Sequence, residues 1–187
     1  MALDVLLLLL IATIVVVAAA EGLVRTLVIG LIFYLLTLLI GALLLGFGLA
    51  HFLNDLVVGS VGGASRTPLF YQGIIFVGLL IPGFAGGIVL SHLTLGNTSI
   101  RALGWGDNVL GTLVGIFIGL AFAAIICNAW GVMVRETWEP TSSWLSMRTT
   151  FQSSGLRPYM MDVLRSYRRL LFPFAATRYP IFFQPHG

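Results

Sequence analysis

Four long apolar runs dominate the sequence, and each has about the length that a helix needs to cross a lipid bilayer. They lie at about residues 3–20, 23–53, 71–93 and 108–134. A spanning helix takes roughly 20 apolar residues, and none of the runs shows the alternation of a β-barrel strand. The chain is 58% hydrophobic and only 9% charged, against roughly 25% charged in an ordinary soluble domain. The sequence therefore predicts an all-α integral membrane protein with four transmembrane helices.

The runs also predict how the chain is divided. Residues 1–135 form one transmembrane domain, and residues 136–187 form a more polar tail. Only Glu21 and Gly22 separate the first two runs, so we expect a tight antiparallel helical hairpin. The first run has the apolar core of a signal peptide, but Asp4 stands where such a peptide carries positive charge. We therefore expect this run to remain in the membrane as a helix.

An amphipathic helix is predicted in the tail, at residues 156–172. On a helical wheel most of its apolar side chains fall in one arc, and its charged side chains fall outside that arc. This pattern is typical of a helix in the membrane interface with its Arg side chains toward the headgroups. The same pattern suits a helix packed on a partner protein. The membrane-surface candidates are Arg157, Arg165, Arg168 and Arg169.

Small residues recur at every fourth position of the fourth run and form a stripe on one face of a helix. Such stripes let helices approach closely in lipid. A second small patch lies in the third run, around Pro82, which predicts a kink. We expect the third and fourth helices to pack together through these two patches. The helix-packing candidates are Gly111, Gly115, Gly119 and Ala123 in the fourth run and Gly83 and Gly87 in the third.

Asp107 stands at the entry to the fourth run. A carboxylate at a helix N-terminus accepts hydrogen bonds from free amides and is favoured by the helix dipole, so we interpret Asp107 as a cap of its own helix. The alternative is a charge cluster on the membrane face opposite the termini, with an ion pair between Arg25 and Asp107. The candidates for that cluster are Glu21, Arg25, Arg101 and Asp107.

The Arg residues predict the orientation of the chain. With four spans, both termini share one side with Arg66 and the seven Arg residues from Arg135 onward. The other side holds only Arg25 and Arg101. Because an excess of Arg marks the cytoplasmic side, we expect both termini in the cytoplasm of a bacterial cell, and the protein in its inner membrane.

The residues give no pattern of a catalytic or metal site, so we expect neither an enzyme nor a resident cofactor. No metalloprotease helix motif, phosphate-binding loop or Ser/His/Asp arrangement occurs. The sequence has one cysteine, Cys127, and its Arg residues are mixed with seven acids, which excludes a nucleic-acid surface. His51 and His92 fall at opposite membrane faces, about 30 Å apart, too far to hold one haem together. A single haem or pigment ligand at His51 or His92 is the alternative.

Several short motifs resemble the CvpA family, the colicin V production protein family. "LDVLLLLL" resembles its opening segment, and "EGLVRTLV" its first helical hairpin. "GWGDNVLGTLVGIFIGL" is similar to the entry into its last helix, and "W…SSGLRP…LLFP" to its terminal pattern. The resemblance implies a four-helix inner-membrane protein tied to colicin V export and envelope homeostasis, without catalytic residues to carry over.

Three functional hypotheses follow. The first is a non-enzymatic membrane protein of the CvpA type that supports secretion or envelope homeostasis. The second is an accessory structural subunit of a larger membrane complex, such as a respiratory or photosynthetic one, which makes other membrane subunits its partners besides the lipid bilayer. The third is a small transporter or channel, which the lack of an ionisable residue near the middle of a run disfavours.

Overall fold

The computed structural model describes residues 2–46, 68–95, 104–171 and 183, and all its regular structure in these ranges is helical. The protein is therefore all-α over the residues described. The second predicted run is described only as far as residue 46, so its predicted end at residue 53 lies outside the described residues. The helices are α1 (Ala2–Gly46), α3 (Pro68–Leu95), α4 (Gly106–Met133), α5 (Thr141–Gln152) and α6 (Arg157–Leu171).

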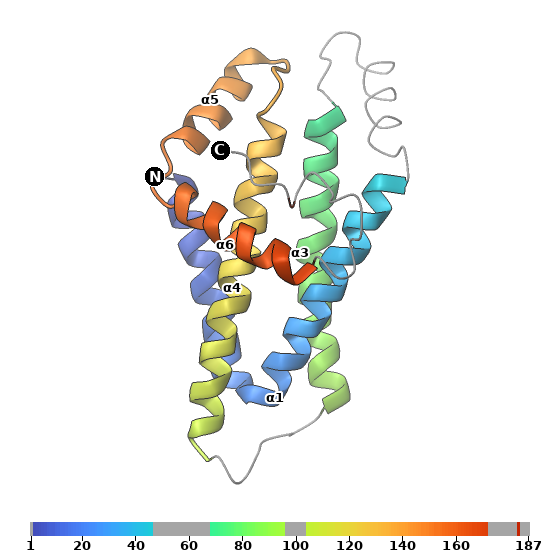
Figure 1. The fold of residues 1–187 in the computed structure, drawn as a ribbon, viewed down its shortest axis with the longest axis vertical. Coiled ribbons are helices and arrows are strands. Elements are labelled where there is room, and N and C mark those ends of the chain that lie inside the picture. Colours follow the sequence, from blue (N-terminus) through green and yellow to red (C-terminus); the bar gives the residue numbers. More distant parts are fainter. Residues whose placement is uncertain (1, 47–67, 96–103, 172–182, 184–187) are drawn as a thin grey trace.

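Helix α1 is bent sharply at Gly22 into two arms. Gly22 has φ 77° and ψ 178°, a conformation that only glycine adopts at low cost. The Thr26 hydroxyl donates to the carbonyl oxygens of Gly22, at 2.7 Å, and of Ala18, at 3.3 Å. In a straight helix Ala18 and Thr26 would be about 12 Å apart along the axis, so the chain folds back here. Figure 1 shows the first arm running down from the N-terminus and the second arm rising away from the bend.

Among the described residues, three helical segments are long and apolar enough to cross a membrane, judged by length and composition: Ala2–Gly41, Leu69–Leu95 and Gly106–Met133. The first of them contains the bend at Gly22. Each of the others includes most or all of a predicted run. The chain is thus built as a multi-pass membrane protein.

The glycine stripe of α4 packs against the first arm of α1. A Cβ added at Gly111 would lie 2.7 Å from the carbonyl carbon of Gly22 and 2.8 Å from the oxygen of Ala18. One added at Gly115 would overlap the Ala18 side chain, and one at Gly119 would touch Ile11. The first arm and α4 therefore approach backbone to backbone.

The small patch of α3 packs against the second arm of α1. A Cβ added at Gly83 would lie 2.8 Å from a methyl of Leu36, and one at Gly87 would lie 2.6 Å from a methyl of Ile32. The prediction that α3 and α4 meet through both patches is therefore wrong, because each patch receives one arm of α1. Gly78 and Gly86, by contrast, have no neighbour within 4 Å of an added Cβ.

Helix α5 covers the end of α4 that lies nearest the N-terminus in Figure 1. Phe151 of α5 stacks on Gly131, where an added Cβ would lie 2.7 Å from the ring. Three indole N–H groups tie this end together by donating to backbone carbonyl oxygens: Trp130 to Met147, Trp138 to Met133 and Trp144 to Val134. The sequence patterns did not predict α5, because its apolar side chains follow no clear helical period.

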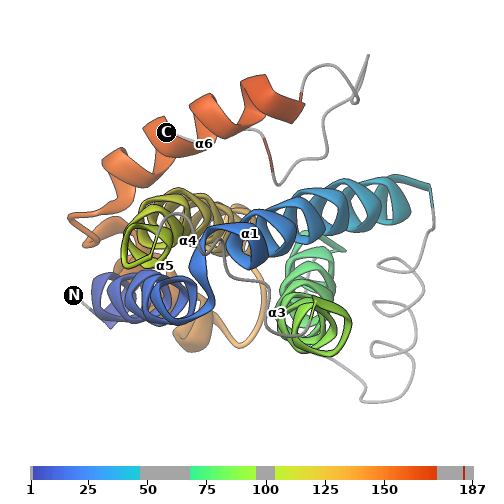
Figure 2. The ribbon, with the colours of Figure 1, turned by 90° about the horizontal axis from the view of Figure 1, so that it is seen from below.

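Helix α6 lies across the outside of α4 and the second arm of α1 (Figure 2). Met160, Leu164 and Tyr167 on its apolar face are buried, and the Tyr167 ring lies 5.9 Å from that of Phe33. Burial raises the pKa of Tyr167, which keeps its hydroxyl protonated for the 2.9 Å hydrogen bond with the hydroxyl of Thr37. The apolar face was predicted to lie on lipid or on a partner. It packs instead on helices of its own chain, which offer it a large apolar wall.

Candidate functional site at the bend of the first helix

Asp107 joins α4 to the bend in α1. Its Oδ1 accepts a 3.0 Å hydrogen bond from the backbone N–H of Leu23, and the residue is only 4% exposed. Leu23 is the first residue of the second arm, and the first amides of a helix have no partner within it. Asp107 therefore caps a neighbouring helix. The interpretation of Asp107 as the cap of α4 is wrong, because Trp105 holds that position and makes no side-chain capping bond.

Gly22 is required at the bend for two reasons. Its positive φ is strained for any other residue, and an added Cβ would overlap Oδ2 of Asp107. Together with Gly111, it lets α4 come close enough for the short Asp107 side chain to reach Leu23. The bend is thus a specific contact between two elements that lie far apart in the sequence.

Beside the bend, the carboxylate of Glu21 contacts two side chains, Arg25 and His92. Its Oε2 lies 2.8 Å from Nη1 of Arg25, and its Oε1 lies 2.5 Å from Nε2 of His92 at the end of α3. Nη1 of Arg25 also lies 3.5 Å from Nδ1 of His92. A neutral imidazole protonated on Nε2 satisfies both contacts, since it donates to Glu21 and accepts from Arg25.

The predicted charge cluster is therefore only partly assembled as expected. Glu21 and Arg25 do lie together, but Arg25 pairs with Glu21 and His92, while Asp107 accepts the amide of Leu23. The prediction of an ion pair between Arg25 and Asp107 is therefore wrong. The carboxylate of Asp107 accepts a hydrogen bond from the free amide of Leu23, and Arg25 pairs with Glu21. Arg101 lies outside the described residues.

A second aspartate makes a matching contact at the other end of the first arm. Oδ1 of Asp4 accepts hydrogen bonds from the hydroxyl of Ser154, at 2.7 Å, and from the N–H of Leu156, at 3.0 Å. These groups precede α6, so Asp4 fixes the turn that leads into it. The motifs that contain Asp4, Ser154 and Leu156 were visible in the sequence, but nothing in their spacing indicates that they meet.

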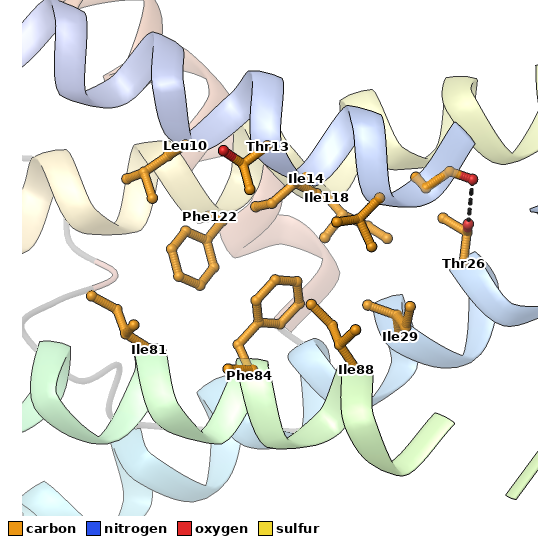
Figure 3. Close-up of a pocket in the computed structure, with 13 residues that line it drawn as sticks. Leu10, Thr13, Ile14, Thr26, Ile29, Ile81, Phe84, Ile88, Ile118 and Phe122 are labelled. Carbon is orange, nitrogen blue, oxygen red and sulfur yellow. Dashed lines mark hydrogen bonds between the residues drawn. The ribbon is translucent and has the colours of Figure 1, made fainter. Parts of the chain in front are cut away.

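An apolar cavity of about 220 Å³ lies between the two arms of α1, α3 and α4. Figure 3 shows Leu10 and Ile14 of the first arm facing Phe84 and Ile81 of α3 across it. The rings of Phe84 and Phe122 lie 5.0 Å apart at its wall. The hydroxyls of Thr13 and Thr26, which also line it, bond to backbone carbonyls. The cavity suits a hydrocarbon chain better than a polar solute, and helical periodicity alone could not have revealed it.

The described part of the chain holds no group of three or more His, Cys, Asp or Glu side chains that could bind a metal ion. Cys127 is fully buried in α4. Of the two candidate histidine ligands, His92 contacts Glu21 and Arg25, and His51 lies outside the described residues. A haem or pigment ligand at either histidine stays a prediction from the sequence.

Membrane-capable helices that are tied together by aspartate caps and close glycine contacts define a multi-pass α-helical membrane protein. Residues 3–165 match the family described as "Colicin V production protein", and the chain belongs to that family. The match contains both aspartates, the bend and most of α6. Neither a curated protein nor a solved structure matches the chain.

Proposed function

We propose that this protein is a non-enzymatic component of a bacterial inner membrane that supports secretion or envelope homeostasis. The observation that carries the proposal is the family match, which covers residues 3–165 and so takes in every described helix except the end of α6. The contacts of the described residues are consistent with it. The carboxylates of Asp4 and Asp107 accept hydrogen bonds from backbone amides, and the carboxylate of Glu21 forms an ion pair with Arg25, which are structural roles.

We further propose that both arms of α1 cross the bilayer, which gives four crossings. The first arm, up to the bend at Gly22, is about 30 Å long at 1.5 Å per residue, and the second, up to Gly46, is about 36 Å. Both lengths match a hydrocarbon core of about 30 Å. With four crossings, the distribution of Arg residues favours cytoplasmic termini.

The apolar cavity supports a role in handling lipid or another hydrophobic molecule. It lies between helices that reach across the membrane, and its lining side chains are almost all aliphatic or aromatic. An apolar cavity excludes water and binds apolar molecules of fitting size. A lipid acyl chain is the occupant that the surroundings provide in abundance.

Complementation tests the proposed function directly. The wild-type chain is expressed in a colicin V-producing strain that lacks its own family member, and secreted colicin V is measured together with resistance of the envelope to detergent. We expect the wild type to restore both. Asp107→Leu should restore neither, whereas Glu136→Leu, a matched carboxylate substitution at an exposed turn, should behave as wild type. A wild-type chain that restores neither property would contradict the proposal.

Intact mass spectrometry distinguishes the hypothesis of an accessory subunit from the function proposed above. The protein is purified in mild detergent from its own membranes. A partner at fixed stoichiometry would favour the accessory subunit, and the chain alone with bound lipid would favour the function proposed above.

A further inference from the structure

Helix α6 descends along the outside of the bundle to about the middle of the second arm of α1. Its beginning is held by Asp4, which lies about 27 Å along the first arm from the bend. Its end is held by Tyr34, whose hydroxyl donates a 3.1 Å hydrogen bond to the carbonyl of Leu170. Tyr34 is only about 18 Å along the second arm from the bend. The difference in residue counts corresponds to a drop of roughly 9 Å toward the bend. Figure 1 shows α6 slanting toward the bend as it crosses α4.

The outward face of α6 carries charged and polar side chains along this path, and Tyr159 and Leu170 are also exposed on it. The side chains of Arg165 and Asp162 are 60% and 68% exposed and form an ion pair of 2.5 Å. Ser166 and Arg169 are exposed as well, one turn further down. The inward face is occupied, because Leu164 and Tyr167 are buried against the bundle. Within the described part of the chain, the exposed polar side chains of α6 therefore point away from the apolar packing of the bundle.

A polar face at this depth is incompatible with contact with acyl chains. Charged side chains in the hydrocarbon region are costly unless water, headgroups or other polar groups reach them. Snorkelling relieves this cost for a cation near the membrane surface, but the lower end of α6 lies beside the middle of a spanning arm. The charge on this face is mainly positive, with four Arg residues and one Asp along α6. Its natural counterpart is an anion.

We propose that phospholipid headgroups and their water are drawn down along the polar face of α6, so that the leaflet beside it is locally thinned. The phosphate groups pair with the exposed Arg side chains of α6. The polar face of α6 is thus an interface with lipid headgroups, and it makes one side of the protein hydrophilic within the depth of the membrane. The inference rests on the proposed crossing of the bilayer by the second arm of α1.

Spin labels at two positions of similar depth test the inference. Ser166→Cys places a label on the polar face of α6, and Leu35→Cys places one on the second arm, where Leu35 is 54% exposed next to Tyr34. The full chain is reconstituted in vesicles of phosphatidylethanolamine and phosphatidylglycerol that contain a lipid with a Ni²⁺-chelating headgroup. Relaxation of each label by headgroup Ni²⁺ and by dissolved oxygen is measured. The wild-type chain serves as the blank, because Cys127 is fully buried.

We expect the label at position 166 to be relaxed by Ni²⁺ several-fold more than the label at position 35, and the order to reverse with oxygen. Oxygen-dominated relaxation at both positions would place α6 among acyl chains and overturn the inference. Shielding of position 166 from both agents would mean that protein covers the face, which also overturns it. Strong relaxation by Ni²⁺ at position 35 would instead show that the second arm lies outside the hydrocarbon core, which would contradict the proposed topology itself.

Discussion

Replacing Gly22 with alanine should be among the most damaging single-methyl changes in this protein. The backbone conformation of Gly22, φ 77° and ψ 178°, is strained for alanine by about 1–3 kcal/mol. The new methyl would also overlap Oδ2 of Asp107 and displace its hydrogen bond to Leu23, which costs a further ~1–3 kcal/mol for a buried charged acceptor. We expect Gly22→Ala to lose about 2–6 kcal/mol of unfolding free energy.

The assay is equilibrium unfolding by sodium dodecyl sulfate in mixed micelles, followed by tryptophan fluorescence. Two glycines serve as controls. Gly104 also has a positive φ, 50°, but an added Cβ has no neighbour within 4 Å, so Gly104→Ala should show strain alone, about 1 kcal/mol. Gly78→Ala, in an open helical position, should be neutral or stabilising by up to about 1 kcal/mol.

A double variant separates the two causes. In an Asp107→Ala background the methyl at position 22 meets no carboxylate, so Gly22→Ala should then cost only the backbone strain, about 1–3 kcal/mol. Equal stability of Gly22→Ala and Gly78→Ala would refute the reasoning, since it would mean that the bend needs neither the positive φ nor the contact with Asp107.

Three further substitutions test other contacts. Asp4→Ala should lose about 2–3 kcal/mol and speed amide hydrogen exchange in α6, because two hydrogen bonds to a carboxylate disappear; unchanged exchange would count against this contact. Gly115→Leu should separate α4 from Ala18 and prevent folding, whereas Gly86→Leu, in open space, should not; similar yields of folded protein from both would be the contrary result. Ala85→Phe should fill the cavity and reduce the lipid that remains bound in native mass spectrometry, and undiminished lipid would argue against an acyl chain there.

The sequence predicted the features of this fold that depend on local composition. The apolar runs predicted the membrane-capable helices, and the short Glu21-Gly22 link predicted where the chain turns back. Both follow from properties of contiguous residues, namely the length of an apolar run and the freedom of glycine to adopt a positive φ.

The sequence could not predict which helix packs against which. Helical spacing shows which residues share a face, but it does not show which element that face contacts. The stripe at Gly111 and Gly115 was assigned to α3 but receives the first arm of α1. The same reason explains Asp107, which caps a helix 84 residues away in the sequence. It also explains α6, whose amphipathic wheel fits lipid, a partner or its own bundle equally well.

The central claim, that α1 folds back at Gly22 so that the chain crosses the bilayer four times, is tested most directly by side-specific thiol labelling. Single cysteines replace Ala20 beside the bend, Ser65 and Asn97, and intact cells are treated with a membrane-impermeant maleimide before and after permeabilisation. The account predicts that positions 20 and 97 are labelled in intact cells and that position 65 is labelled only after permeabilisation. A cysteine at position 20 that stays unlabelled under both conditions, with positions 65 and 97 still on opposite sides, would place the bend inside the membrane and contradict the account.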